Sequence, residues 1–419
     1  MLVGAIGLAL IVLRLDRTLK HGVIQEFGGW IYTGGPQGAR TLLSTIASSM
    51  INIAGVTFSL VVVALQLASS QFGPRLLRNF MRDTGNQLVL GTFLATFIYC
   101  LIVLRTIRED KDNVFVPNIS ITVAVVLAFA SLGVLIYFIH HMAEAIQADN
   151  LIAKVNRELD DAIERLFPMK LGQEPPKQRR WLEEIPADFD REACPIMAAR
   201  SGYIQGIDNN KLMKIATKNN LLLRLKSRPG KFVVKGSEII RAWPRQRVNE
   251  QLARQLDNSF LWGVQRTEQQ DVEYPLNRLV EIAVRALSPA VNDPFTAIRC
   301  IDRLGEALCH LAAKDIPSPY RYDEENKLRV IADPVTFAGM TDAAFNQIRQ
   351  YGQSSAAVTI RLLETLAVVA AHTHNQKDCA ALLHHANMIR RGSDAGLPEE
   401  QDRKDVEARY QAVVRALEH

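Results

Sequence analysis

Paired cysteines are missing from this chain of 419 residues. Its five cysteines, Cys100, Cys194, Cys300, Cys309 and Cys379, lie far apart, and none belongs to a CxxC motif. No Cys/His cluster has zinc-site spacing, which argues against a zinc module and a disulfide framework. Isolated cysteines in a large polar region are typical of a reducing compartment, so we expect the C-terminal part to be cytosolic.

Signatures of catalysis and of nucleic-acid binding are missing as well. The chain contains no P-loop, GxGxxG, GxSxG or HExxH sequence, so we expect no enzyme and no cofactor. The formal net charge of +5 is small for this length, and no basic arm carries interleaved aromatics, which argues against a nucleic-acid partner. The sequence has neither a basic leader nor a small-residue cleavage site, so we expect no signal peptide.

Long apolar runs are absent from residues 147–419 but fill residues 1–146. Because a spanning helix takes roughly 20 residues, we expect about four spans, at 1–13, 41–69, 87–106 and 117–140. The first run is too short to cross a bilayer and is interpreted as the remainder of a truncated span. The fold class predicted is an α-helical polytopic membrane region followed by a mixed soluble domain.

The second span carries polar residues at steps of three and four, which place them on one helical face. This polar row consists of Thr45, Ser48, Asn52, Ser59 and Gln66. Val62 is the large apolar residue of the same period. Because unpaired polar groups are costly in hydrocarbon, the row is predicted either to line a pore or to pack against other helices.

Two further groups of residues lie at the expected ends of the spans. Arg75, Arg78 and Arg82 share a face after the second span, where they suit either lipid phosphates at the inner surface or a solvated loop. His140, His141 and Glu144 end the fourth span and are weak candidates for a metal site. A polar helix exit is the commoner role of such a set, so no metal is expected.

The C-terminal part divides into three segments. Residues 147–193 are predicted to continue the fourth span as a helix and then form a Pro-rich linker. Residues 194–243 predict a small β-module, with a type II turn at Pro229–Gly230. Residues 245–419 are predicted to be mostly helical. The run SSAAVTIRLLETLAVVAAHT contains Arg361 and Glu364, so we expect a buried helix rather than a fifth span.

Residues 266–296 contain a possible cytosolic ligand site, made of Arg266, Asp271, Arg285, Asn292 and Asp293. The first three are predicted to form a buried ion network or to line a pocket. SPAVND is predicted to be a tight turn between two helices, at which free N–H groups can bind an anion. The alternative, which we favour, is a structural corner capped by Asn292 and Asp293.

Two stretches resemble a known family. FSLVVVALQLASSQFGPRLLRNFMRDTGNQLVLGTF and RALSPAVNDPFTA are similar to a family of predicted bacterial inner-membrane proteins classed as a domain of unknown function. The resemblance covers nearly the whole chain and implies a multi-span N-terminal region with a soluble C-terminal region. It implies no activity, cofactor or catalytic residue. The short first span departs from the family pattern.

Two functions fit these patterns. The first is a homo-oligomeric channel or permease for small solutes or ions, with the lipid bilayer as its surroundings and a cytosolic regulatory domain. The second is a membrane-anchored sensor or scaffold, whose spans serve only for anchoring and assembly. An intramembrane enzyme ranks third because the spans offer no nucleophile and base.

Overall fold

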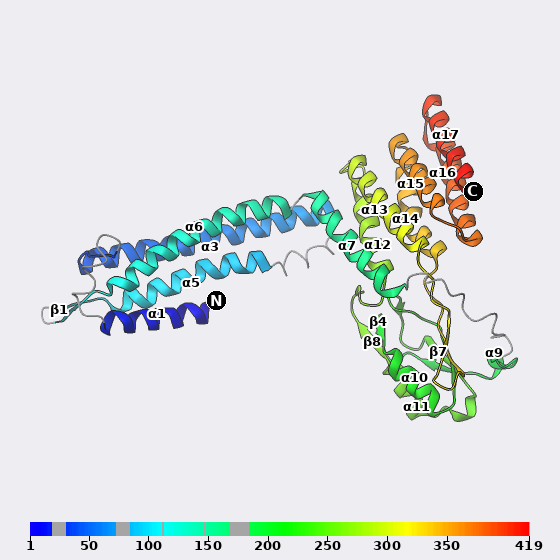
Figure 1. The fold of residues 1–419 in the computed structure, drawn as a ribbon, viewed down its shortest axis with the longest axis horizontal. Coiled ribbons are helices and arrows are strands. Elements are labelled where there is room, and N and C mark those ends of the chain that lie inside the picture. The colour runs from blue at the N-terminus through cyan, green and yellow to red at the C-terminus, as the bar shows by residue number, and fades with distance from the viewer. Residues whose placement is uncertain (19–30, 73–83, 111–112, 146, 168–183, 419) are drawn as a thin grey trace. The chain divides into compact units, whose positions relative to one another are not determined.

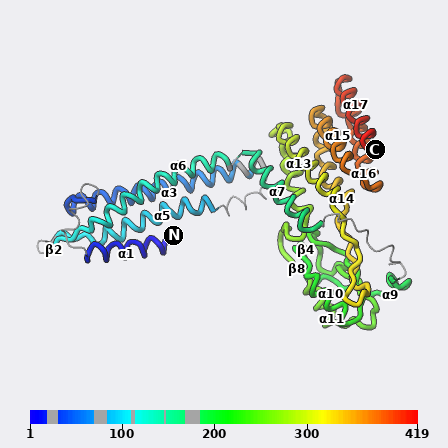
Figure 2. Tube along the Cα trace, viewed as in Figure 1, coloured from blue at the N-terminus to red at the C-terminus, as the bar shows by residue number. Residues whose placement is uncertain are grey.

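The structure is a computed structural model that describes residues 1–18, 31–72, 84–110, 113–145, 147–167 and 184–418. Two compact units make up the chain, residues 1–150 and residues 151–419 (Figures 1 and 2). We call them the membrane unit and the soluble unit and describe each by itself.

Apolar helices and one hairpin form the membrane unit. The elements are α1 (Leu2–Thr18), α3 (Pro36–Phe72), α5 (Thr84–Thr106), β1 (Arg108–Asp110), β2 (Asn113–Phe115) and α6 (Asn118–Ala145). Among the described residues α3, α5 and α6 are long and apolar enough to cross a bilayer. The predicted polytopic region is therefore confirmed, but the count of four spans is not, because α1 has 17 residues.

Small and aromatic side chains fill the interior of the membrane unit. On α3, Ala39, Leu43 and Ala47 are buried in a cluster with Tyr99 and Cys100 of α5. The carboxylate of Asp16 on α1 accepts hydrogen bonds from the backbone N–H groups of Ile119 and Ser120, each at 2.9 Å. Asp16 thus caps the first turn of α6 from a neighbouring helix, where helical N–H groups have no partner of their own.

Helix α7 (Ala148–Leu166) begins three residues after α6 ends at Ala145, so the predicted continuous helix is two helices. The apolar face of α7 is buried through Val155, Leu159 and Ile163. Two acidic residues of α7 form ion pairs with residues later in the chain: Glu158 pairs with Arg278, and Glu164 pairs with Lys314. Together these contacts fix α7 against the first helices of the soluble unit.

The β-module is larger than residues 194–243. A five-stranded sheet has the order β3-β7-β5-β10-β9, and a three-stranded antiparallel sheet has the order β6-β4-β8. The strands are β3 (Cys194–Met197), β4 (Gly202–Ile207), β5 (Leu222–Leu225), β6 (Phe232–Val233), β7 (Glu238–Trp243), β8 (Phe260–Gly263), β9 (Tyr320–Tyr322) and β10 (Leu328–Ile331). Strands β8, β9 and β10 come from the segment predicted to be helical.

Short helices close the core of this module. They are α9 (Phe189–Glu192), α10 (Asn209–Lys218), the 3-10 turn η2 (Arg245–Arg247) and α11 (Glu250–Asp257). Asp208 caps α10 by accepting from the backbone N–H of Lys211, and Asn249 caps α11 by accepting from that of Leu252. Leu212 of α10 and Leu256 of α11 are buried in the same apolar core as the strands.

Six helices form two parallel layers in the rest of the soluble unit (Figure 1). One layer holds α12 (Glu273–Ala286), α14 (Phe337–Gly352) and α16 (Gln376–Gly396), and the other holds α13 (Pro294–Ala312), α15 (Ala356–Ala371) and α17 (Glu400–Leu417). The prediction of a buried helix at α15 is confirmed, since Leu362, Leu363 and Leu366 lie in the core.

Candidate functional sites

The polar row of α3 lies together on an exposed face of the membrane unit. All five predicted residues, Thr45, Ser48, Asn52, Ser59 and Gln66, are exposed. The opposite face of α3 is the buried one, through residues such as Ala47, Met50 and Ala54. The row therefore points away from the other described helices of its own unit.

The hydroxyl groups and the amide groups of this row differ in their hydrogen bonding. Thr45 donates to the carbonyl of Thr41 at 2.7 Å, and Ser59 donates to the carbonyl of Gly55 at 3.0 Å. Within the described part of the chain, the amide side chains of Asn52 and Gln66 make no hydrogen bond. Because an amide without partners is costly in hydrocarbon, these two residues require water or another protein surface.

The arginines predicted at the inner surface, Arg75, Arg78 and Arg82, lie outside the described residues. His140 pairs with Glu144 at 3.1 Å, one helical turn away, and both side chains are exposed. His141 instead stacks on Tyr137, with ring centroids 5.6 Å apart. In the described ranges no group of three His, Cys, Asp or Glu side chains is placed to hold a metal ion.

Arg266 and Asp271 form the ion pair that the sequence predicted. The guanidinium donates to both carboxylate oxygens, at 2.8 and 3.0 Å, and the Asp271 side chain is 3% exposed. Burial raises the pKa of Asp271, and the hydrogen bonds from Arg266 oppose that rise. Gly230 passes so close that a Cβ there would lie 2.2 Å from Asp271 Oδ2.

Arg285 does not belong to this network. Asp271 lies just before the first turn of α12, whereas Arg285 lies in its last turn. The 14 residues of α12 are about 21 Å long at the usual helical rise. The structure therefore brings together only Arg266 and Asp271 of the three residues predicted to form a network or line a pocket. The first two residues anchor the β-module to the start of α12.

The SPAVND segment is a corner between α12 and α13. Asn292 takes a left-handed conformation with φ of 48°, and the backbone N–H of Asp293 donates to the carbonyl of Ala286 at 2.8 Å. The Asp293 carboxylate accepts from the backbone N–H of Thr296 at 3.1 Å and from its hydroxyl at 2.5 Å. Burial raises the pKa of Asp293, but the hydrogen bonds from Thr296 and Phe295 outweigh it, so that the pKa lies below its usual value.

This geometry confirms the predicted cap of α13, whereas anion binding at the corner stays a prediction. The described residues show four features: three helices that can cross a bilayer, an exposed polar row, a mixed β/α soluble unit and the capped SPAVND corner. A family model described as predicted membrane protein (DUF2254) matches residues 1–368. The chain belongs to this family.

The chain is similar to mycobacterial proteins whose names state no function. Uncharacterized proteins of Mycobacterium bovis and Mycobacterium tuberculosis are each 33% identical over 378 residues, which cover 89% of this chain and 71% of each relative. No solved structure matches the chain. The DUF2254 match ends within α15, so α16 and α17 lie beyond it.

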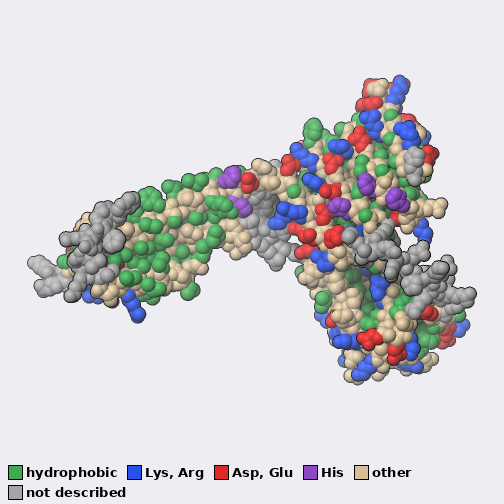
Figure 3. All heavy atoms as spheres, in the orientation of Figure 1, with side chains coloured by type: hydrophobic (Ala, Val, Ile, Leu, Met, Phe, Trp, Pro, Cys, Tyr) green, Lys and Arg blue, Asp and Glu red, His purple; other side chains and the backbone are tan. Residues whose placement is uncertain are grey.

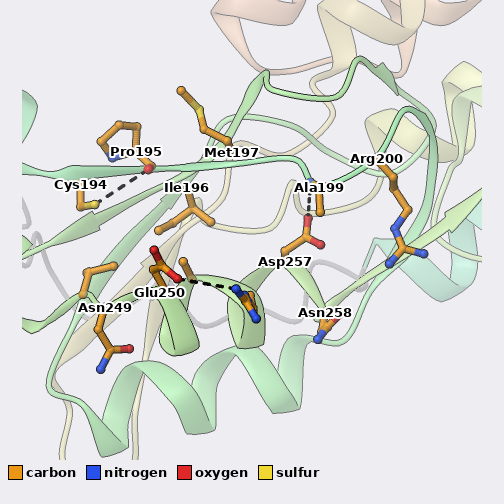
Figure 4. A pocket seen from close by; sticks show the side chains of 13 residues that line it. Cys194, Pro195, Ile196, Met197, Ala199, Arg200, Asn249, Glu250, Asp257 and Asn258 are labelled. Carbon is orange, nitrogen blue, oxygen red and sulfur yellow. Dashed lines mark hydrogen bonds and ion pairs between the residues drawn. The ribbon is translucent and has the colours of Figure 1, made fainter.

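One cavity of this DUF2254 member corresponds to none of the sites predicted from the sequence. It has a volume of about 570 Å³ and lies between strand β3 and helix α11 (Figure 4). Its walls include Cys194, Met197 and Arg200 on one side and Glu250 and Asp257 on the other. Asp257 is 5% exposed and accepts from the backbone N–H of Ala199 at 3.2 Å.

The two acidic side chains of this cavity are held by neighbouring groups. Asp257 is engaged in holding the strand, and Glu250 pairs with Arg254 at 3.6 Å on the rim. No local sequence pattern reveals the cavity, because its two walls come from segments about fifty residues apart. Asn249 caps the N-terminus of α11 in that second wall, and an Asn ahead of a helical stretch is a pattern visible in the sequence.

Proposed function

We propose that the protein is a homo-oligomeric channel or permease for small solutes or ions in the bacterial inner membrane. The exposed polar row of α3 is the observation that carries this proposal. In a lone subunit the amides of Asn52 and Gln66 would meet lipid. When several copies assemble around these faces, the same groups contact water in a shared path.

The charge of the row limits the class of transport. Its members are hydroxyl and amide residues without a formal charge, which argues against a proton relay of titratable side chains. Val62, 46% exposed, lies in the row between Ser59 and Gln66 and is placed to narrow the path as an apolar gate.

The soluble unit is proposed to be a cytosolic regulatory domain. Its four cysteines, Cys194, Cys300, Cys309 and Cys379, are free thiols, as expected in a reducing compartment. If α1 is the fourth span, as the sequence predicts, the number of spans is even and both chain ends lie on that side. A reporter enzyme that is active only in the periplasm, fused after the last residue, should stay silent; strong reporter activity would reverse this topology.

A membrane-anchored sensor or scaffold is the second candidate. The observation in its favour is that Thr45 and Ser59 satisfy their hydroxyl groups within α3 itself. Under this reading the row packs against a second copy of α3 without water, in the manner of interfaces built from small and polar residues.

Cysteine accessibility separates the two candidates. In a variant without the native cysteines, single cysteines replace Asn52, Ser59 and Gln66. A membrane-impermeant thiol reagent should modify all three in the channel. Matched controls at Ile53, Leu60 and Leu67 should stay unmodified, because one residue rotates a side chain by about 100° around the helix.

Substitution of Asn52 by leucine provides the second measurement. In a channel the oligomer should persist while conductance falls, because the path becomes drier. In a packed interface Asn52→Leu should dissociate the oligomer, with the loss of an interhelical hydrogen bond of about 1 kcal/mol. Protection at all six cysteine positions together with dissociation of Asn52→Leu would refute the channel.

A further inference from the structure

The three-stranded sheet of the soluble unit has an apolar outer face. The alternation along the strands buries Ile204, Val233 and Phe260 on the inner side. On the outer side Phe232 is 57% exposed and Leu261 53% exposed. Val234, which follows β6, has the outward parity of Phe232 and is 57% exposed. Val264, in the bend after β8, is 90% exposed.

Strand pairing brings the outer residues to one side of the sheet. In the register of the sheet, Tyr203 on the central strand β4 lies opposite Phe232 on β6 and opposite Gly263 on β8. The rings of Tyr203 and Phe232 meet edge to face, with centroids 5.1 Å apart. Strands β4 and β8 lie side by side in Figure 1. Phe232, Tyr203 and Leu261 therefore lie on one side of the sheet, with the side chain of Gln205 close against Gly263; we call this surface the β6-β4-β8 face.

Cations border the β6-β4-β8 face. Lys231 and Lys235 flank Phe232 and Val234 in the sequence, and the backbone N–H of Lys235 donates to the hydroxyl of Ser201, next to Arg200. Lys235 and Arg200 are exposed and make no ion pair with any described residue. Lys231, 51% exposed, lies 3.5 Å from a carboxylate oxygen of Glu273.

Glu273 does not neutralise the positive charge of Lys231, Lys235 and Arg200. Glu273 is 12% exposed and is already paired with Arg228 at 2.6 Å. Residues 184–263 contain 14 Lys and Arg against 8 Asp and Glu, an excess of six positive charges in a chain whose formal net charge is +5. The positive charge of the whole chain thus comes from the β-module.

We propose that the β6-β4-β8 face docks on the anionic headgroup surface of the membrane. Phe232, Val234 and Val264 enter the boundary between headgroups and acyl chains, and Lys235, Lys231 and Arg200 contact lipid phosphates. An apolar centre with a cationic border is the pattern of interfacial membrane binding. A second copy of the same face is disfavoured, because it would bring like charges together.

Lipid quenching tests this docking in the full-length protein. Single cysteines replace Phe232 or Val264 in the cysteine-free background and carry a fluorescent label. The protein is placed in nanodiscs whose lipids carry bromine on the acyl chains, either neutral phosphatidylcholine or equal parts phosphatidylcholine and phosphatidylglycerol. A label at Val368 of α15, 56% exposed and in the same unit, is the matched control.

Labels at Phe232 and Val264 should be quenched in the anionic discs, less quenched in the neutral discs, and released by high salt. The label at Val368 should stay bright. The triple variant Arg200→Gln, Lys231→Gln and Lys235→Gln should lose the quenching in anionic discs, and its melting temperature should stay unchanged because all three side chains are exposed.

Three outcomes would overturn the proposal. The labels at Phe232 and Val264 stay as bright as the Val368 label in both discs, or the quenching is equal in neutral and anionic discs and insensitive to salt. In the third, cysteines at Phe232 crosslink between copies without lipid quenching, which identifies a second copy as the partner. The test uses labels outside α3, so it is independent of the channel proposal.

Discussion

The membrane unit and the soluble unit differ in the side chains that they leave at the surface. Large apolar residues of the membrane unit are widely exposed, such as Val63 at 61%, Phe129 at 71% and Ile136 at 65%. Figure 3 shows these hydrophobic side chains over the membrane unit, and charged side chains of both signs over the soluble unit. The soluble unit instead exposes a few apolar residues in restricted places, one of which is the β6-β4-β8 face.

This difference shows how each unit is held together. Burial of leucine, isoleucine and valine stabilises the soluble unit, because water surrounds it. Lipid gives helices little hydrophobic reason to associate, so close packing of small residues and internal hydrogen bonds become more important. The membrane unit follows this rule, with buried Ala39 and Ala47 and a hydrogen bond of 3.1 Å between Thr96 and Ser131.

The largest effect is expected for Gly230→Ala in the soluble unit. The new Cβ would lie 2.2 Å from Asp271 Oδ2, at a backbone φ of 87°. Displacing Asp271 from Arg266 should cost about 3 kcal/mol, with about 1 kcal/mol more for the left-handed backbone. Hydrogen exchange should rise in β4 and stay unchanged in α5, which separates the stabilities of the two units.

Gly236→Ala is the matched control for this change. Gly236 has a similar φ of 85°, but a Cβ there meets nothing within 4 Å. The Gly236→Ala variant should lose only about 1 kcal/mol of unfolding free energy. If the two variants were equally stable, close contact with Asp271 would not explain the role of Gly230.

An intermediate effect is expected for Asp16→Ala in the membrane unit. The change removes the acceptor of the Ile119 and Ser120 N–H groups, and a lost cap costs about 1–2 kcal/mol. The measurement is the temperature at which the buried thiol of Cys100 reacts in detergent, with the other cysteines replaced by alanine. Asp16→Asn keeps one acceptor oxygen, so its reaction temperature should lie between those of the wild type and Asp16→Ala. An unchanged temperature for Asp16→Ala would show that this contact adds no stability.

Local patterns in the sequence predicted much of this fold. Length and apolarity located α3, α5 and α6, and the charges of Arg361 and Glu364 identified α15 as a buried helix of the soluble unit. The Pro229–Gly230 turn signal is matched by the φ of 87° at Gly230. Each of these features depends on neighbouring residues, so a single sequence contains the whole signal.

Features that depend on distant contacts were missed. Strand β10 pairs in parallel with β5, with Val330 opposite Leu223, across more than a hundred residues. No local pattern selects that partner for a strand of four residues. The period of the polar row predicts that Asn52 and Gln66 share one face of α3. It does not predict which face of α3 contacts α5 and α6, because that depends on packing between helices.

The smallest effect concerns Asp293, at the corner of the soluble unit. Asp293→Ala removes the acceptor of the Thr296 N–H, and the unfolding free energy should fall by about 1 kcal/mol at neutral pH. Asp293→Asn should keep most of the stability, because an amide oxygen also caps a helix. The measurement is the denaturant midpoint of the soluble unit, followed by hydrogen exchange in α13.

The pH dependence of this loss distinguishes a cap from a ligand site. The folded pKa of Asp293 lies below the unfolded value of about 3.9, because Thr296 and Phe295 stabilise the carboxylate. The stabilisation is therefore complete above the unfolded value and is lost as the pH falls through the folded pKa. Asp293→Ala and the wild type should converge in that acidic range, whereas Asp293→Asn should show no such change. A ligand site would behave differently, since Asp293→Ala would then keep native stability at every pH while abolishing function.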